Sequence, residues 1–205
     1  MNTKSVLAIF LLLSSLCSCK HDEGTVQPTP QASIDFPLGA GSVWTYAIYD
    51  SVSLTRDTVQ VKILSTTNTS TDAQSVWQLR YIQHTDTVLV VHLFDTLRFN
   101  NFSVSPNGQV LPLVYPLQVG NHWSTEYSTI LVASIDTVSS PGGVFSNSVR
   151  VEQHSYHVGN DYSFTDYWIE PKVGIVQIYR FASVTVGLNP QARTTWTLLS
   201  FKLFQ

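Results

Sequence analysis

The chain has 205 residues, of which 43% are hydrophobic and 12% aromatic, while only 12% are charged and the net charge is −3. Globular proteins carry about 25% charged residues, so this composition is typical of extracellular β-structure rich in Thr, Ser, Val and Tyr. Since no basic patch is present, nucleic acid is excluded as a partner, and anionic membrane surfaces should not attract the chain.

The N-terminus reads as an export signal. Lys4 supplies a positive charge, and an apolar run from Val6 to Leu16 follows. A signal-peptide core needs about 7–15 apolar residues, whereas a helix that spans a bilayer needs about 20. A buried core helix is the alternative, but a helix with almost no polar face fits a β-rich remainder poorly.

The segment Leu16-Cys17-Ser18-Cys19 resembles the bacterial lipobox. The resemblance selects Cys19, because the small Ser18 precedes it, whereas Cys17 follows the bulky Leu16. It implies cleavage before Cys19 and a thioether-linked diacylglycerol on that residue. With Cys17 removed and Cys19 acylated, the mature chain has no free thiol and no disulfide. A Cys17–Cys19 bridge or a metal site on the pair is the alternative.

Three regions follow from this pattern. Residues 1–18 form the signal peptide, residues 19–33 the lipidated cysteine and a flexible tether, and residues 34–205 a single β-rich domain. The tether lacks periodicity and cannot bury enough apolar area to order itself; its reach is about 20 Å. The run Lys20-His21-Asp22-Glu23 resembles the surface-export signal of some Gram-negative lipoproteins. We therefore expect a protein anchored in the outer membrane, on its periplasmic side or at the cell surface.

Beyond the tether the hydrophobic pattern alternates with a period of two, which predicts strands. In each of three predicted strands, apolar residues share one face. The sets are Trp44, Tyr46 and Ile48; Val59, Val61 and Ile63; and Trp77, Leu79 and Tyr81. Further strands are predicted over Val88–Phe94 (apolar on both faces, hence central and fully covered), Ile130–Asp136, Val149–Tyr156, Tyr162–Ile169, Ile175–Phe181 and Trp196–Leu203. Turn signals separate them at Pro106-Asn107-Gly108, Pro141-Gly142-Gly143, Gly159-Asn160, Val173-Gly174 and Asn189-Pro190. The fold class is therefore all-β: an antiparallel sandwich, a barrel-like sheet or a strongly curved sheet of nine or more strands, without substantial helix after the signal peptide.

One motif occurs twice, at residues 36–45 and 115–124: an aromatic residue, Pro-Leu, a glycine three residues later and then a tryptophan. Proline ends an extended segment, glycine permits a turn with positive φ, and the tryptophan opens a strand and packs inward. Each copy is expected to be a corner that feeds a strand into the sheet. The alternative is a pair of aromatic platforms for a ligand.

This motif is similar to one found in a loose group of exported bacterial lipoproteins of unknown function. Members also carry a Pro-x-Gly-x-Phe turn and a Tyr-Trp-x-x-Pro-x-Val-Gly segment. The corresponding residues here are Pro141 to Phe145, with one residue extra, and Tyr167 to Gly174. The resemblance supports the fold and implies no activity.

Signatures of catalysis are absent: there is no Gly-x-Ser-x-Gly, phosphate loop, His-Glu-x-x-His or Cys-x-x-Cys. His154 and His157 are three residues apart, so on one strand they point to opposite faces and cannot share a metal. Three Asp-Thr-Val triplets, beginning at Asp57, Asp86 and Asp136, read as strand starts and not as carboxylate chemistry. No cofactor and no metal is expected.

The one specific site prediction concerns a hairpin of Val149–His157 and Tyr162–Glu170 with a two-residue Gly159-Asn160 turn. In that register Val151 faces Trp168 and Glu152 faces Tyr167. Core residues would be Val149, Val151, Phe164 and Trp168, with Asp166 and Glu170 on the same side. The other side would carry the candidate binding residues Glu152, His154, Tyr156 and Tyr167, beside Arg150 and Thr165. A polar face with two aromatic rings suits a sugar or a peptide; an ordinary solvated face is the alternative.

The favoured function is a lipid-anchored, non-catalytic envelope protein that binds a glycan, a protein or another envelope component. A carrier of an apolar ligand such as a lipid in a curved-sheet cavity is the second hypothesis. A hydrolase that uses carboxylates such as Glu152 and Asp166 is the third. An outer-membrane barrel is a fourth, for which strands of about ten residues with a lipid-facing apolar band would be needed.

Overall fold

The computed structural model describes residues 35–69, 72–100, 110–156, 162–183 and 192–204. The predicted signal peptide, Cys19, the tether and the export signal lie outside these ranges, as do three of the predicted turns, at residues 106–108, 159–160 and 189–190. A helix that is long and apolar enough to cross a membrane is not found among the described residues.

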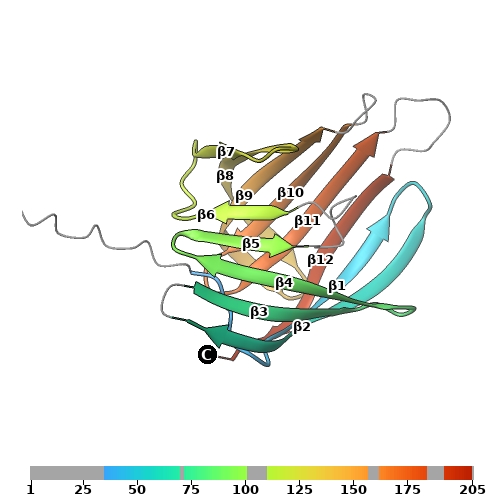
Figure 1. The fold of residues 1–205 in the computed structure, drawn as a ribbon. Coiled ribbons are helices and arrows are strands. Elements are labelled where there is room, and N and C mark those ends of the chain that lie inside the picture. Colours follow the sequence, from blue (N-terminus) through green and yellow to red (C-terminus); the bar gives the residue numbers. More distant parts are fainter. Residues whose placement is uncertain (1–34, 70–71, 101–109, 157–161, 184–191, 205) are drawn as a thin grey trace, which may run out of the picture. The chain divides into compact units, whose positions relative to one another are not determined.

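The described residues form twelve strands, which all belong to one antiparallel sheet (Figure 1). They are β1 (Val43–Asp50), β2 (Thr55–Asn68), β3 (Asp72–Arg80), β4 (Thr85–Leu93), β5 (Thr96–Asn100), β6 (Leu111–Val114), β7 (His122–Ser124), β8 (Ser128–Ser140), β9 (Gly143–Tyr156), β10 (Tyr162–Glu170), β11 (Gly174–Ser183) and β12 (Ala192–Lys202). The all-β prediction is confirmed, and among its alternatives the curved sheet is the one found.

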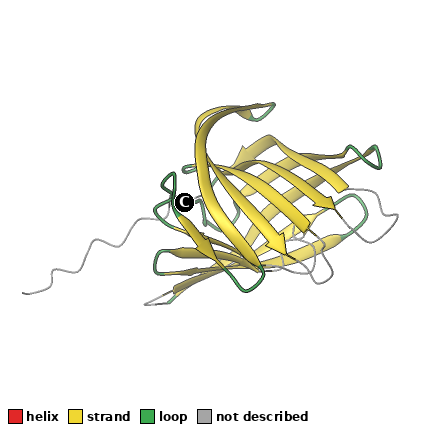
Figure 2. Cartoon of the chain, turned by 90° about the horizontal axis from the view of Figure 1, so that it is seen from above, coloured by secondary structure: helices red, strands yellow, loops and turns green. Residues whose placement is uncertain are grey.

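The sheet consists of two meanders. Strands β1 to β6 follow one another outward in one direction, β7 to β12 do so from the other edge, and β1 pairs with β12 in the middle. The sheet is strongly curved (Figure 2), and its two edge strands, β6 and β7, lie near each other (Figure 1). The indole Nε1–H of Trp123 on β7 donates to the carbonyl of Pro112 on β6 over 3.0 Å. We call this junction between β6 and β7 the seam. A side-chain hydrogen bond closes it, not a ladder of backbone hydrogen bonds.

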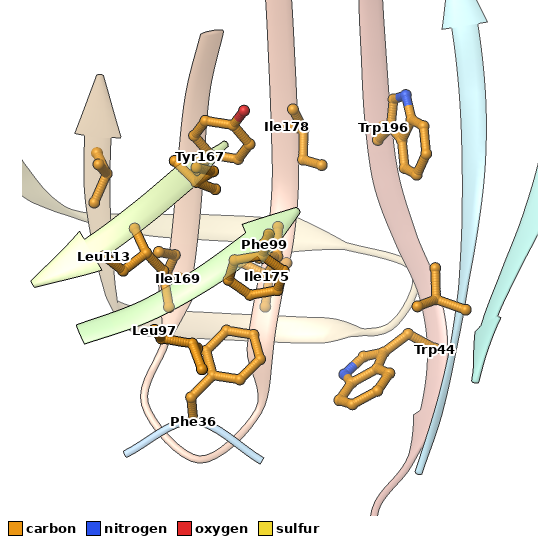
Figure 3. Close-up of a cluster of buried hydrophobic side chains, with 14 of the residues drawn as sticks. Phe36, Trp44, Leu97, Phe99, Leu113, Tyr167, Ile169, Ile175, Ile178 and Trp196 are labelled. Atoms are coloured by element: carbon orange, nitrogen blue, oxygen red, sulfur yellow. The ribbon is translucent and has the colours of Figure 1, made fainter. Parts of the chain in front are cut away.

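The core fills the concave inner face of the sheet. The predicted inward positions are correct for Trp44, Val59, Val61, Ile63 and Leu79, all of which are at most 2% exposed. Side chains from β5 and β6 point toward those of β10 and β11 across the interior (Figure 3). Trp44 stacks on Trp77 with ring centroids 5.4 Å apart. The interior is thus a packed core in which the two meanders meet.

One predicted core strand is only half covered. Val88–Phe94 was expected to be buried on both faces, but in β4 only Val88 and Val90 are buried, while Leu89 is 40% exposed and Phe94, in the turn after β4, is 59% exposed. The expectation is wrong because no second layer covers the outer face of β4 among the described residues, so its apolar outer residues face solvent.

The repeated motif forms two equivalent corners. Gly41 and Gly120 have φ angles of 90° and 93°, the positive values that glycine tolerates best. Gly41 donates its N–H to the carbonyl of Ile63, and Gly120 donates to that of Val132. In both copies the residue after the glycine closes a turn with its N–H: Ser42 donates to the carbonyl of Gly39, and Asn121 donates to that of Gln118. The motif therefore does what the corner interpretation predicts at the start of each meander.

The distal part of the β8–β9 hairpin, residues 136–148, leaves the curved sheet and lies over the outer face of β10–β12. We call it the arm. Register shifts at Val132/Ser134 and Asp136/Val138 in β8 bend the strand, as β-bulges do. The N–H of Gly142 at the tip bonds to the carbonyl of Leu198 on β12, and the arm passes behind β10 and β11 in Figure 3. The arm therefore covers the part of this outer face around Trp168, which donates to Asp136, and around the carbonyl of Leu198.

Candidate binding site on the outer face

The register of the β9–β10 hairpin differs by one residue from the predicted one. Tyr156 pairs with Tyr162, Val151 with Tyr167, and Glu152 with Asp166. Paired residues share a face, so Tyr167 belongs to the core, where it is 0% exposed, and Asp166 lies outside. The placement of Tyr167 on the polar face and of Trp168, Phe164 and Asp166 on the core side is therefore wrong.

The shift has a local cause. With the predicted two-residue turn, the numbers of paired residues would sum to 319. In the observed register they sum to 318, and the last pair, Tyr156 and Tyr162, encloses five residues, 157–161. The inner positions near this end are small or polar: Gln153, Ser155, Ser163 and Thr165 are at most 5% exposed. Hydrophobic alternation consequently gave no correct indication of which face of β10 is buried.

The outer face of β9 and β10 carries a charged network of Arg150, Glu152, His154 and Asp166. Nη2 of Arg150 lies 2.9 Å from Oε1 of Glu152 and 2.9 Å from Oδ2 of Asp166. Nε2 of His154 lies 3.6 Å from Oε2 of Glu152. One guanidinium thus bridges two carboxylates that face each other across neighbouring strands.

Burial distinguishes the two carboxylates. The side chain of Asp166 is 7% exposed and that of Glu152 21%. Burial raises the pKa of Asp166, and the attraction of Arg150 only partly offsets this. Trp168, which pairs with Arg150, lies under its guanidinium at 5.6 Å and donates its indole N–H to Asp136 of the arm over 2.8 Å. The network is therefore anchored to both the sheet and the arm.

Above this network, a row of rings crosses three strands. His154 stacks on Phe164 at 6.0 Å, Phe164 stacks on Phe181 at 5.2 Å, and Arg193 lies 5.6 Å from the ring of Phe181. Interplanar angles of 26° and 23° mean that these rings stack on one another. Because their faces are used for mutual stacking, the row stabilises strand pairing and is a poor flat platform for a ligand.

A groove of 350 Å³ lies at the β7 side of this row. We call it the histidine groove; its lining residues are His122, Trp123, Ser124, Thr129, Ile130, Leu131 and His154. Strand pairing brings His122 opposite Leu131, which in turn pairs with Glu152. The groove therefore borders the charged network through His154 and the seam through Trp123.

Two of the four predicted binding residues, Glu152 and His154, lie together at this site. Tyr156 pairs with Tyr162 in the strand ladder, but its side chain lies outside the description, as does the whole of His157. His122 was missed. Its only sequence signal is its position in the second corner motif, directly before Trp123, because the pairing that places it near His154 spans three strands.

Metal chemistry receives no support from the described residues, among which no group of three or more His, Cys, Asp or Glu could hold an ion. The Asp-Thr-Val triplets lie within strands and not at one site: Asp57 in β2, Asp86 in β4 and Asp136 in β8. Asp57 and Asp86 fall near the start of their strands, as predicted, whereas Asp136 falls in mid-strand at a bulge.

Comparison with known proteins places the fold. No protein-family model and no curated protein matches the chain. Two solved structures are similar. One, described as a "putative lipoprotein" from Parabacteroides distasonis, has a TM-score of 0.56 and 11% identity, and the match covers 83% of this chain and 99% of that one. The other, a "putative exported protein" with a YmcC-like fold from Bacteroides fragilis, has a TM-score of 0.57 and 13% identity, covering 82% and 98%. At these identities the likeness shows that the chain shares their fold.

Proposed function

We propose that this chain is a lipid-anchored protein of the bacterial outer membrane that binds a glycan, without catalysis, in the histidine groove. The observation that carries the proposal is the groove itself, which is lined by two histidines, two hydroxyl residues and three apolar residues beside the edge strand β7. The lipobox at Cys19 and the descriptions of the two structural neighbours as lipoprotein and exported protein support the envelope location.

The chemistry of the groove favours a sugar. Its 350 Å³ is at the lower end of the range for small-ligand sites, about 300–1,000 Å³. His122, His154, Ser124 and Thr129 can donate to or accept from sugar hydroxyls, while Leu131, 38% exposed, offers an apolar surface to C–H groups. The nearby carboxylates outnumber the single Arg150, which disfavours an anionic polymer.

The charged network argues against hydrolysis. A carboxylate pair can act in glycosidic cleavage when one member is protonated and both reach the scissile bond. Here both carboxylates contact the same Nη2 of Arg150, and Asp166 is almost fully buried. The pair therefore suits a structural role that holds His154 at the groove through Glu152.

The packed interior argues against a carrier. The inner face is filled by large side chains in mutual contact, including Trp44, Trp77 and Phe99. An apolar ligand the size of a lipid would have to displace part of this core, at a cost of several kcal/mol for each large side chain removed from its contacts.

Binding can be tested with a glycan array probed with wild type and with His122→Ala and His154→Ala. His84→Ala is the matched control, since His84 is an exposed histidine at the β3–β4 turn, away from the groove. We expect both groove variants to lose binding and the control to retain it. Retention by both groove variants contradicts the proposed site, and a peptide ligand found in place of a glycan contradicts the ligand class.

The anchor needs a separate test. Metabolic labelling with radioactive palmitate should label wild type and Cys17→Ala but not Cys19→Ala. Label on Cys19→Ala would contradict the assigned lipid site. Protease treatment of intact cells addresses the finer prediction of surface display, which requires the domain to be cleaved; complete protection would place it on the periplasmic side.

A further inference from the structure

The first and the last described residues of the chain lie at the same end of the sheet. Asp35, the first described residue, lies at this end, and its carbonyl accepts the N–H of Lys172 in the β10–β11 turn. Ser42 and Phe204, near the C-terminus, hydrogen-bond to each other. We call this the tether end. It also holds the β4–β5 turn and the second corner, because Tyr115 donates to the carbonyl of Asp95.

Two neighbouring pockets open at the tether end and share Asp35. The larger, 360 Å³, is walled mainly by Phe36, Pro37, Leu38, Leu203 and Phe204, with Lys172 at its rim. The smaller, 140 Å³, is walled by Tyr115, Pro116, Leu117, Val149, Ile169 and Pro171. Together they form a largely apolar depression on either side of the point where the described chain begins.

Exposed apolar side chains and cations surround this depression. Phe94 is 59% exposed, Val119 54% and Phe204 43%. All three lysines in the described ranges lie at this end. Lys62 and Lys202 flank Val43 at the start of β1, and Lys172 sits in the β10–β11 turn. Nζ of Lys202 lies 4.9 Å from the ring centroid of Phe204. Aromatic rings beside lysines that extend toward phosphates are the side chains suited to a membrane interface.

We propose that the tether end rests on the phospholipid surface, with Phe94, Val119 and Phe204 at the headgroup level and the lysines toward lipid phosphates. The proposal rests on the lipid anchor proposed above. The chain outside the structure supplies the second argument. Cys19 is separated from Asp35 by a segment with a reach of about 20 Å, and this segment joins the sheet between the two pockets.

The opposite end supplies a control. Leu54 and Ile82, in the β1–β2 and β3–β4 turns, are 72% and 74% exposed, so apolar exposure alone does not distinguish the two ends. The opposite end also has a pocket, of 350 Å³ and lined by Arg80 and Ile82 among others, and it carries the cation of Arg56 at the β1–β2 turn. What distinguishes the tether end is the chain entry, which is flanked by two pockets with mainly apolar walls. The proposal therefore predicts membrane contact at Val119 and none at Ile82.

The absence of thiols from the mature chain makes this measurable. Val119→Cys and Ile82→Cys can each be labelled with an environment-sensitive fluorophore in the full lipidated protein, reconstituted in phosphatidylethanolamine–phosphatidylglycerol vesicles that carry nitroxide lipids. We expect severalfold stronger quenching at position 119 than at position 82. Equal quenching at the two positions, or stronger quenching at 82, overturns the proposal.

Flotation of the same vesicles separates this result from a failure of the anchor. If the protein floats with the vesicles but shows no preferential quenching, the anchor holds and the membrane-facing end is wrong. If the protein does not float, the anchor itself is wrong and the orientation proposal falls with it. Phe94→Asp is a supporting variant, since aspartate tolerates the positive φ of 54° at this position. It should weaken quenching at position 119, whereas Leu54→Asp should leave it unchanged.

Discussion

Trp44 and Trp123 occupy the same position in the two corner motifs, and each donates its indole N–H to a distant backbone carbonyl. Trp44 donates to Val173 over 2.7 Å and Trp123 to Pro112 over 3.0 Å. Their surroundings differ, because Trp44 lies where β1 and β12 form a continuous ladder, while Trp123 lies at the seam. The tryptophan of the motif thus packs beside a continuous strand ladder in the first copy, whereas in the second copy it links two edge strands that form no ladder.

Trp123→Phe should loosen the seam. The substitution removes the donor to Pro112 while keeping an aromatic ring, so we expect a loss of about 1 kcal/mol. Amide hydrogen exchange should accelerate in β6 and β7 and stay unchanged in β1 and β12. Trp44→Phe should instead cost roughly 1–3 kcal/mol, because Trp44 is 1% exposed. Uniform acceleration across the sheet in Trp123→Phe would contradict a locally held seam.

Alanine at the corner glycines should strain the backbone. Gly120→Ala meets no atom within 4 Å, and Gly41→Ala meets only the ring of Phe204 at 3.5 Å, so space is not the obstacle. The φ angles near +90° are the obstacle, and each substitution should lower the free energy of unfolding by about 1–3 kcal/mol. Urea denaturation measures both. A neutral effect at either position would refute the strained-corner account.

Tyr167→Ala and Trp168→Ala compare the two faces of β10. Tyr167 is fully buried and its hydroxyl donates to Gln153 over 3.2 Å, so its removal should cost about 3–5 kcal/mol. Trp168, on the outer face, should cost less. The reverse order in thermal or urea unfolding would restore the two-residue turn register and remove the site described above.

The fold could be predicted from the sequence further than the site could. Alternation located the inner faces of β1, β2 and β3 because Trp44, Val59 and Leu79 alternate with polar residues. The turns at Pro141-Gly142 and Val173-Gly174 were also correct, since Ser140 pairs with Gly143 and Gly174 starts β11. Strands β5 and β6 were missed. Each is short, and Pro112 in β6 is tolerated only because this strand lies at an edge.

The site was harder because its register depends on a loop. In β10 aromatic residues occupy both faces, with Phe164 and Trp168 outside and Tyr167 inside, so the pattern could not choose between registers. The groove depends on the neighbouring positions of β7, β8 and β9, which only the folded sheet brings together. Glu152 and His154 were found because β9 itself alternates clearly, with Val149 and Val151 on the inner side.

Removal of the Arg150 side chain should lower the free energy of unfolding, because its two carboxylate partners lose their countercharge. In Arg150→Ala, Glu152 and the buried Asp166 would face each other without a countercharge, and we expect a loss of about 2–3 kcal/mol at pH 7, less than for a fully buried pair because Arg150 is 34% exposed. Arg150→Lys should recover part of this loss. Unfolding midpoints for the three proteins provide the measurement; identical values would show that the network is not a stabilising unit.

The pH dependence of stability should reflect the raised pKa of Asp166. Because burial raises its folded-state pKa above the usual 3.8, the native protein binds a proton more tightly than the unfolded chain. This contribution is fully present below pH 3.8 and is lost as the pH rises through the folded-state pKa. Asp166→Asn should lack this loss. Its stability relative to wild type should therefore rise as the pH increases from about 4 to 7, and parallel curves would contradict the raised pKa.

The central claim is that a glycan binds at the histidine groove, and amide hydrogen exchange with and without a saturating glycan ligand tests it most directly. The account predicts slower exchange in residues 122–131 and 152–154, with no change at the tether end, and loss of this protection in His154→Ala. Protection confined to the tether-end pockets, or the same protection in His154→Ala, would contradict it.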